Sequence, residues 1–128
     1  MKYRILLIED SVFIRYQLQQ YLIDLNMEIV GEYNNPQEGI PAFEILKPDI
    51  VVVDYSLLNV TGIQVVEEIL SRNIYANIVL LLPSQLFHRT QEFVGMGIKG
   101  VLTKPFYPEK VQKVMIEVAV NLSRSVSH

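Results

Sequence analysis

The chain has 128 residues, 50% of them hydrophobic, with a formal net charge of −3 and no cysteine. This length suits a single domain with its own core, and the apolar content is typical of a sheet that is buried on both faces. The mildly acidic balance argues against direct nucleic-acid binding, and the lack of cysteine excludes disulfides and thiolate metal sites. No apolar run approaches the roughly 18 residues of a membrane helix, and Lys2-Tyr3-Arg4 leads straight into a strand-like run, which makes a poor signal peptide. We therefore expect a cytoplasmic protein that does not contact a membrane.

The first third of the chain predicts a strand, a helix and a second strand. The apolar run Tyr3–Ile8 stops at Glu9-Asp10 and lacks the alternation of a half-exposed strand. A helix follows, with Asp10 or Ser11 as its N-cap. Its apolar face contains Ile14, Leu18, Tyr21, Leu22 and Leu25. Ile29–Tyr33 is the second strand-like run.

The middle of the chain repeats this order. A helix is predicted over about Pro36 to Leu46, and we expect it to begin near Pro41 or to bend there, because an interior proline removes a hydrogen bond. Ile50–Val53 is a third apolar strand, and it stops at Asp54. The next helix follows Gly62, with an apolar face at Ile63, Val66, Ile69 and Leu70.

The last part of the chain predicts two more strands, Ile78–Leu82 and Gly100–Thr103. The helix between them, about Ser84 to Val94, has the weakest pattern. A final helix begins near Pro108, with an apolar face at Val111, Val114, Val118 and Leu122. The polar end is expected to fray or to lead into a linker, so we divide the chain into a domain, 1–122, and a tail or start of a linker, 123–128.

Strand and helix alternate five times along the chain. With right-handed crossovers this alternation predicts an α/β fold with a doubly wound, five-stranded parallel sheet. Such sheets bind ligands at the carboxyl ends of their strands. Four of the runs end in polar residues, at Glu9-Asp10, Asp54, Pro83-Ser84 and Lys104-Pro105. We therefore expect three carboxylates and one ammonium to gather at one edge of the sheet.

Three carboxylates at one edge suggest a divalent cation. Oxygen ligands of this kind suit Mg²⁺, which uses one or two carboxylates together with water and phosphate oxygens. A bound cation would neutralise Glu9, Asp10 and Asp54, and would let a phosphoryl group approach Asp54 as the nucleophile. Taken singly, Asp10 also suits a helix N-cap, Glu9 a solvated strand end and Asp54 a turn.

Lys104 supplies the single ammonium at this edge. It could pair with Asp54 at rest and with a phosphoryl oxygen afterwards, or it could be a solvated lysine at the end of a strand. A cis Lys104–Pro105 peptide bond would produce a tight bend that aims Lys104 into the crevice.

In their order and spacing, these residues resemble the receiver domains of bacterial two-component response regulators, of the chemotaxis-regulator type. The resemblance extends from Lys2 to about Leu122. The matching features are Glu9-Asp10, Lys47-Pro48-Asp49, Asp54, Gly62 eight residues beyond it, Gly97, Gly100 and Lys104-Pro105-Phe106. Each feature is common alone, whereas the ordered set is specific.

The resemblance assigns a role to each polar residue of the edge. It implies that Asp54 is the phosphoacceptor and that Lys104 contacts the phosphoryl group. It further implies that Mg²⁺ is bound by Glu9, Asp10, Asp54 and the main-chain carbonyl of Ser56. The fold would be flavodoxin-like, with strand order 2-1-3-4-5.

The resemblance also implies partners. The phosphoryl group would come from a sensor histidine kinase or a phosphotransfer protein. The domain would not be an enzyme, because it would catalyse only its own phosphorylation and dephosphorylation. Two copies could form a homodimer through the last two helices and the strand between them. The sequence identifies neither the kinase and its stimulus nor the output partner or effector domain.

Four positions depart from the family pattern. The strand that ends at Leu82 should end in Thr or Ser, whose hydroxyl moves to bond the phosphoryl oxygen, and Ser84 could supply that hydroxyl only if the loop is rebuilt. The aromatic residue expected three positions before Lys104 is replaced by Val101, and Leu57-Leu58 replaces a common Met-Pro pair. We therefore predict phosphorylation with weakened or rerouted coupling to the surface formed by the last two helices and the strand between them.

Two other functions compete with this interpretation. A degenerate receiver would be a protein-interaction module that works without phosphorylation. Leu82 and Val101 favour it, whereas the intact acidic residues and Lys104 oppose it. A flavin carrier of similar fold would need a Gly- or Ser/Thr-rich phosphate loop after the first strand, but Glu9–Phe13 has no glycine and carries two negative charges.

Overall fold

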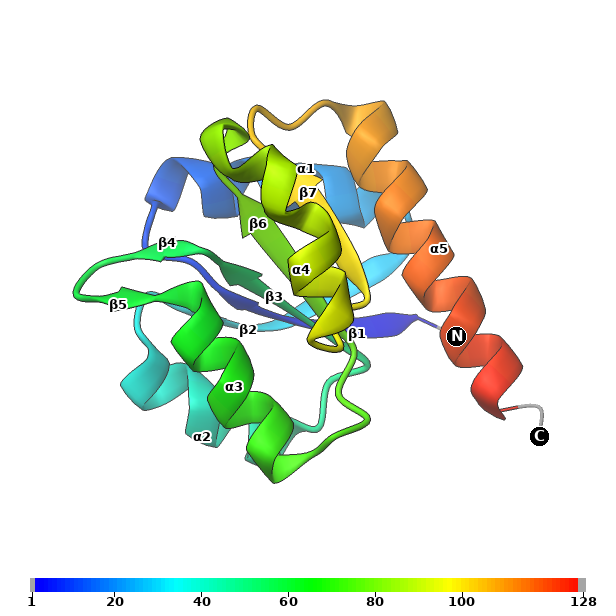
Figure 1. Ribbon diagram of the computed structural model, residues 1–128. Coiled ribbons are helices and arrows are strands. Elements are labelled where there is room, and N and C mark those ends of the chain that lie inside the picture. Colours follow the sequence, from blue (N-terminus) through cyan, green and yellow to red (C-terminus); the bar gives the residue numbers. More distant parts are fainter. Residues whose placement is uncertain (1, 127–128) are drawn as a thin grey trace.

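The computed structural model describes residues 2–126 of the chain, with side chains described from 2 to 122. Strands and helices alternate along it, as Figure 1 shows. In chain order the elements are β1 (Tyr3–Ile8), α1 (Val12–Asp24), β2 (Met27–Tyr33), α2 (Pro36–Leu46), β3 (Ile50–Asp54), β4 (Ser56–Leu57), β5 (Val60–Thr61), α3 (Gly62–Arg72), β6 (Ile78–Leu82), the 3₁₀ helix η1 (Ser84–Arg89), α4 (Thr90–Gly95), β7 (Gly100–Thr103) and α5 (Pro108–Val126).

The main sheet is parallel and has the strand order β2-β1-β3-β6-β7. This is the predicted order 2-1-3-4-5, because the short strands β4 and β5 pair only with each other. All side chains of β3 and β6 are buried, which explains why these runs are apolar without alternation. The predicted doubly wound α/β fold is confirmed.

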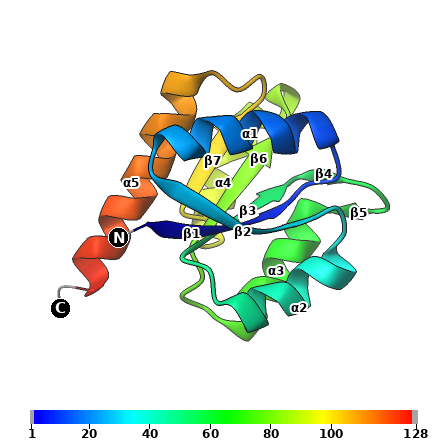
Figure 2. The same ribbon diagram turned by 180° about the vertical axis from the view of Figure 1, so that it is seen from behind.

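Each face of the sheet supports its own apolar cluster, because successive side chains of a strand point to opposite faces. Helices α2, α3 and α4 pack on one face, in a cluster that includes Phe43, Val66 and Phe93. Helices α1 and α5 pack on the other, in a cluster that includes Leu22 and Met115. The view from behind in Figure 2 shows α1 and α5 together on that second face.

Helix α2 runs through Pro41, so the expectation that it begins there is wrong. Asn35 fixes the start, because its Oδ1 accepts a hydrogen bond from the Glu38 N–H at 2.9 Å, and Pro36 suits the first helical position. Pro41 and Gln37 are both exposed. The carbonyl that Pro41 leaves without a helical donor is therefore accessible to water.

Three further elements differ from the predicted boundaries. Strand β2 begins at Met27, two residues early, because Met27 and Glu28 pair with the start of β1. The predicted helix 84–94 divides into η1 and α4, and no side chain among the described residues caps either start. The β4–β5 hairpin was not predicted, and Asn59 in its turn has a positive φ of 68°. Within residues 2–126, no helix has the length and apolar character needed to cross a bilayer.

Candidate functional site

The polar residues of the site begin where the strands end, and main-chain hydrogen bonds fix their positions. The Glu9 N–H donates to the Tyr33 carbonyl at 2.9 Å, and the Lys104 N–H donates to the Leu82 carbonyl at 2.9 Å. Each bond continues the pairing of two strands by one residue. The backbone at Glu9 and at Lys104 is therefore held by the same kind of hydrogen bond as the strands that precede these residues.

Asp54 lies at the centre of this edge, at the last position of β3, and its side chain is 0% exposed. Its Oδ1 accepts a hydrogen bond from the Ser56 N–H at 2.7 Å. Its Oδ2 is 2.8 Å from the Nζ of Lys104, whose side chain is 27% exposed. The Lys104–Pro105 peptide bond is cis, as predicted. The structure thus joins the predicted phosphoacceptor and the predicted phosphoryl contact in one ion pair.

Glu9 is the second buried acid, with 1% of its surface exposed. Its Oε1 accepts a hydrogen bond from the Ser11 N–H at 2.9 Å, whereas no donor among the described residues reaches its buried Oε2. Burial is the main cause that raises the pKa of Glu9 to about 9, and the adjacent Asp54 carboxyl adds to it, while Ser11 and Lys104 act in the opposite direction. Two buried carboxyl groups therefore share one ammonium.

Asp10 is held differently from the other two acids. Its Oδ2 accepts a hydrogen bond from the Leu58 N–H in the β4–β5 turn at 2.9 Å. Among the described side chains, no three acidic or histidine residues form a group arranged to hold a metal ion. The structure therefore brings Glu9 and Asp54 together with Lys104, while Asp10 is tied to the hairpin.

The donor set of the edge fits a hard divalent cation. Glu9 Oε2 and Asp54 Oδ2 are both buried, the two carboxyl groups act on each other, and Asp54 Oδ2 also forms the ion pair with Lys104. Buried oxygens that carry or share negative charge without donors are costly, and a cation would satisfy them. The metal-binding roles of Glu9, Asp10, Asp54 and Ser56 remain predictions that this chemistry supports.

Gly62 lets helix α3 approach the acceptor strand. A Cβ at this position would lie 2.2 Å from the Asp54 carbonyl oxygen and 2.6 Å from the Tyr55 Cα. The Gly62 N–H donates to the Tyr55 carbonyl at 2.7 Å. Any larger residue would push α3 away, so Gly62 fixes the backbone on which Asp54 stands.

The three predicted switch positions carry no hydroxyl that contacts Asp54 among the bonds described. Leu82 is fully buried at the end of β6 and pairs with Thr103 of β7. Val101 is half-buried and packs in the same apolar cluster. Ser84 is exposed on η1, where its Oγ lies 3.5 Å from the Gln85 Oε1.

Two contacts in the site were missed by the sequence analysis. Arg15 donates from its guanidinium to the main-chain carbonyl of Glu9 at 2.5 Å, and the Leu58 N–H holds Asp10. The first contact could have been expected, because Arg15 lies one turn into α1, the helix that follows Glu9-Asp10. The second depends on a hairpin that no pattern in the chain indicates.

The fold and this edge define a class of protein. Residues 5–116 match the response regulator receiver domain, and the chain belongs to that family. It is 29% identical over 116 residues to the chemotaxis protein CheY of Thermotoga maritima, covering 91% of this chain and 97% of that one. It is 34% identical over 126 residues to the transcriptional regulatory protein PdtaR of Mycobacterium tuberculosis, covering 97% of this chain and 60% of that one.

Solved structures agree on the fold. The REC domain of AraT, a response regulator from Geobacillus stearothermophilus, superposes with a TM-score of 0.86 at 20% identity, covering 98% of both chains. The predicted family is therefore confirmed, and the chain is a receiver domain of two-component signalling.

Proposed function

We propose that this receiver domain takes a phosphoryl group onto Asp54 from a phosphohistidine of a sensor histidine kinase or phosphotransfer protein, in the presence of Mg²⁺. The bond between phosphorus and the histidine nitrogen breaks while a bond forms between phosphorus and an Asp54 carboxylate oxygen. The leaving imidazole nitrogen keeps the electron pair of the broken bond. The observation that carries the proposal is the buried Asp54 carboxylate, 2.8 Å from the Lys104 ammonium.

The residues of the edge would divide the work of this transfer. Lys104 holds the Asp54 carboxylate before transfer, and a flexible ammonium can follow the charge to a phosphoryl oxygen afterwards. Glu9, Asp10, Asp54 and the Ser56 main-chain carbonyl would hold Mg²⁺. When bound, Mg²⁺ supplies positive charge that offsets the charge of the acids and of the incoming phosphoryl group.

A degenerate receiver that works without phosphorylation is the alternative, and Leu82 and Val101 favour it. The buried acids argue against it. Glu9 and Asp54 are both buried, Lys104 forms an ion pair with Asp54, and burial raises the pKa of Glu9 to about 9. Burying two acidic groups costs stability, so a module that only docks has no physical reason to keep them.

Several features of the cellular setting stay predictions. They are the cytoplasmic location, the absence of direct nucleic-acid and membrane contacts, and a homodimer through η1, α4, β7 and α5. The division into a domain at 1–122 and a tail at 123–128 also stays a prediction, and α5 extends across that boundary to Val126.

The experiment that tests the proposal is intact-mass spectrometry. The protein is incubated with acetyl phosphate or phosphoramidate, with Mg²⁺ or with EDTA. We expect a phosphoryl adduct that requires Mg²⁺, is absent from Asp54→Asn and persists in the control Asp49→Asn at the opposite end of β3. No adduct with either phosphodonor would overturn the proposal in favour of the degenerate receiver.

A further inference from the structure

The usual relay positions of this receiver are filled by apolar side chains. Leu82 and Val101 belong to one apolar cluster, together with Tyr55 and Phe93. Neither Leu82 nor Val101 can form a hydrogen bond through its side chain. A change at Asp54 must therefore reach the helices through packing or through other polar groups of this cluster.

The segment from η1 to α4 has a single deep anchor. Across Ser84–Gly95, all of which the structure describes, Phe93 is the only buried side chain. No described side chain caps the start of η1 or of α4. Elements with few buried contacts and no caps are the ones that shift at low cost in free energy. Phe93 is therefore the most deeply buried attachment of this segment, and Leu86 packs against the same cluster only partly buried.

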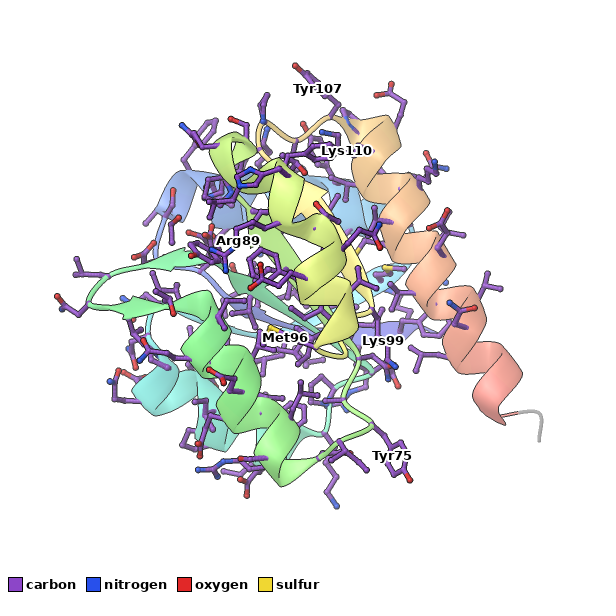
Figure 3. The ribbon with its side chains drawn as sticks, viewed as in Figure 1. Tyr75, Arg89, Met96, Lys99, Tyr107 and Lys110 are labelled. Carbon is purple, nitrogen blue, oxygen red and sulfur yellow. The ribbon has the colours of Figure 1, made fainter. Side chains whose placement is uncertain are left out.

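Phe93 packs against Tyr55, the residue directly after the phosphoacceptor. The two ring centroids are 5.9 Å apart with an interplanar angle of 49°. The guanidinium of Arg89 lies 4.9 Å from the centroid of the Phe93 ring, so Phe93 contacts both Tyr55 and Arg89. Arg89 stands at the start of α4, and Met96 marks its far end (Figure 3). The aromatic pair and the cation thus meet at the end of α4 that follows η1.

Arg89 joins the contact to the helix itself. Its Nε and a terminal nitrogen each donate to the Glu92 carboxylate at 2.9 Å, one turn along. These bonds, followed by a smaller contribution from the Tyr55 side chain, raise the pKa of Arg89 above its ordinary value. The Arg89 side chain therefore contacts Phe93 and Glu92 and interacts electrostatically with Tyr55.

A movement of Tyr55 can displace α4 more easily than α3. On the side of α3, its backbone is fixed by the close approach of Gly62 and by the hydrogen bond from the Gly62 N–H. On the side of α4, it meets a ring and a partly exposed arginine. Tyr55 directly follows Asp54 in the chain, so a rearrangement of the Asp54 carboxylate acts on Tyr55. Of the two helices beside Tyr55, α4 is displaced more easily than α3.

We propose that Tyr55, Phe93 and Arg89 couple Asp54 to the position of η1 and α4, in place of the missing hydroxyl and the missing aromatic residue. The proposal rests on the phosphorylation proposed above and adds its route. The contact between Tyr55 and Phe93 would have two packings, and phosphorylation would favour one of them. The test measures the coupling between Asp54 and this segment directly.

The test is amide hydrogen exchange of the peptides that cover Ser84–Gly95, before and after phosphorylation with phosphoramidate and Mg²⁺. In the parent protein we expect exchange in this segment to change. In Tyr55→Leu the phosphorylated fraction, measured by intact mass, should stay within about twofold, while at least about half of the exchange change is lost. Tyr55→Phe and Arg89→Gln keep the contact between the rings at positions 55 and 93, and each should lose a smaller part of the exchange change. If Tyr55→Leu fails to fold, these two variants test the coupling in its place.

A matched control and a double variant complete the design. Arg72→Gln breaks a similar arginine–glutamate contact on α3 and should keep the full exchange change. Tyr55→Phe combined with Arg89→Gln should lose less than the sum of the two single losses, because the residues act as one unit. A full exchange change in Tyr55→Leu or in both conservative variants, or an equal loss in Arg72→Gln, would overturn the inference. Absence of the adduct in the parent would overturn the proposed function itself.

Discussion

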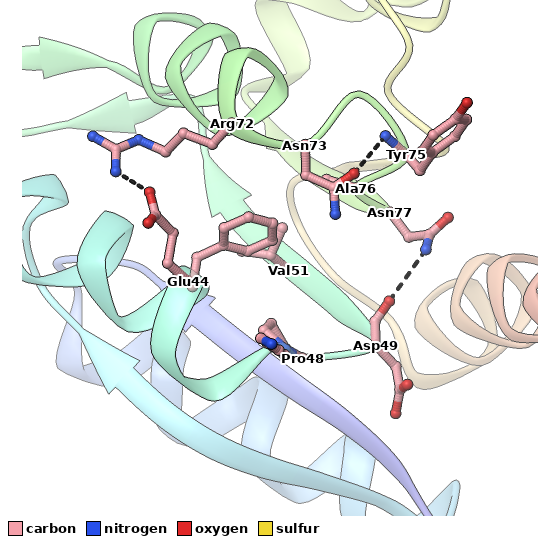
Figure 4. A pocket seen from close by; sticks show the side chains of 11 residues that line it. Glu44, Pro48, Asp49, Val51, Arg72, Asn73, Tyr75, Ala76 and Asn77 are labelled. Atoms are coloured by element: carbon pink, nitrogen blue, oxygen red, sulfur yellow. Dashed lines mark hydrogen bonds and ion pairs between the residues drawn. The ribbon is translucent and has the colours of Figure 1, made fainter.

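The two ends of the sheet carry polar residues in very different states. At the amino edge, a cavity of about 690 Å³ lies between α2, α3 and the loops that enter β3 and β6 (Figure 4). Its polar groups satisfy one another: Arg72 pairs with Glu44, and Asp49 accepts hydrogen bonds from the Arg4 N–H at 2.7 Å and from Asn77 at 3.4 Å. At the carboxyl edge, Glu9 and Asp54 are both buried, no donor among the described residues reaches Glu9 Oε2, and Asp54 Oδ2 depends on the Lys104 ammonium.

The candidate functional edge therefore differs from the amino edge by its buried acidic groups, which cost stability, and not by a cavity. Paired, partly exposed groups contribute little and need no ligand. Two buried acids beside one ammonium have a cost in stability that a bound cation can offset. Four changes to the protein or its solvent test this contrast.

The stability of the metal-free protein should fall as pH rises. The pKa of Glu9 is raised to about 9 in the folded state from the ordinary value of 4.5, mainly by burial. The folded state therefore holds a proton that the unfolded chain has released, so this stabilisation is complete below the lower value and is lost as pH rises through the upper one. Asp54 and Lys104 face the group and act on it in opposite directions.

Urea unfolding in EDTA at a series of pH values measures this effect. Glu9→Gln removes the titrating group, so its stability should change less over the same interval. Identical pH slopes for the two proteins would show that the Glu9 proton does not contribute.

Lys104→Met should destabilise the folded protein, because it leaves the Asp54 carboxylate buried without its ammonium. We expect a loss of about 2–3 kcal/mol, below the roughly 3–5 kcal/mol of a fully buried pair, because the Lys104 side chain is 27% exposed. Urea unfolding near neutral pH gives the value. Lys99→Met is the matched control, since Lys99 is exposed, and it should change stability by no more than about 0.5 kcal/mol. Equal effects of the two changes would contradict the contrast.

Leu82→Thr should strengthen the response to phosphorylation. It restores a hydroxyl that can bond the phosphoryl oxygen, and one such charge-assisted hydrogen bond is worth roughly 1.5–3 kcal/mol. Nuclear magnetic resonance should show larger phosphorylation-induced shifts near Val101 than in the parent. Leu80→Thr introduces the same group two residues earlier on the same face and should not enlarge them. Equal shifts in Leu82→Thr and the parent would remove this explanation.

Arg72→Gln at the amino edge should have the smallest effect. The ion pairs of Arg72 with Glu44 and Glu68 are partly exposed, and exposed pairs contribute little to stability. Its urea-unfolding midpoint should be close to that of the parent. A loss as large as that of Lys104→Met would mean that the amino edge is as electrostatically important as the carboxyl edge.

Much of the fold could be predicted because local patterns and tertiary structure agree. The bounds of β1, β6 and β7 match their apolar runs, and none of the residues in these strands is exposed. The start of α2 could not be predicted from Pro41, because the helix tolerates a proline that lacks an N–H donor where the proline is exposed. That exposure depends on the tertiary structure. Glu28 interrupted the pattern of β2 because an edge strand tolerates exposed polar residues.

The candidate site was only partly predictable for a similar reason. Strand ends placed Glu9, Asp54 and Lys104 at one edge, because parallel strands share their direction. The position of Asp10 depends on the Leu58 N–H in a hairpin, and the contact of Tyr55 with Phe93 joins residues far apart in the chain. Periodicity describes neither kind of contact.

If the buried Asp54 carboxylate beside the Lys104 ammonium accepts the phosphoryl group, that group must be found on Asp54. The protein is treated with phosphoramidate and Mg²⁺, the acyl phosphate is reduced with borohydride, and the peptides are sequenced by tandem mass spectrometry. The account predicts modification at Asp54, dependent on Mg²⁺. Modification at Asp10 or Asp49 instead, or none at any carboxylate, would contradict it.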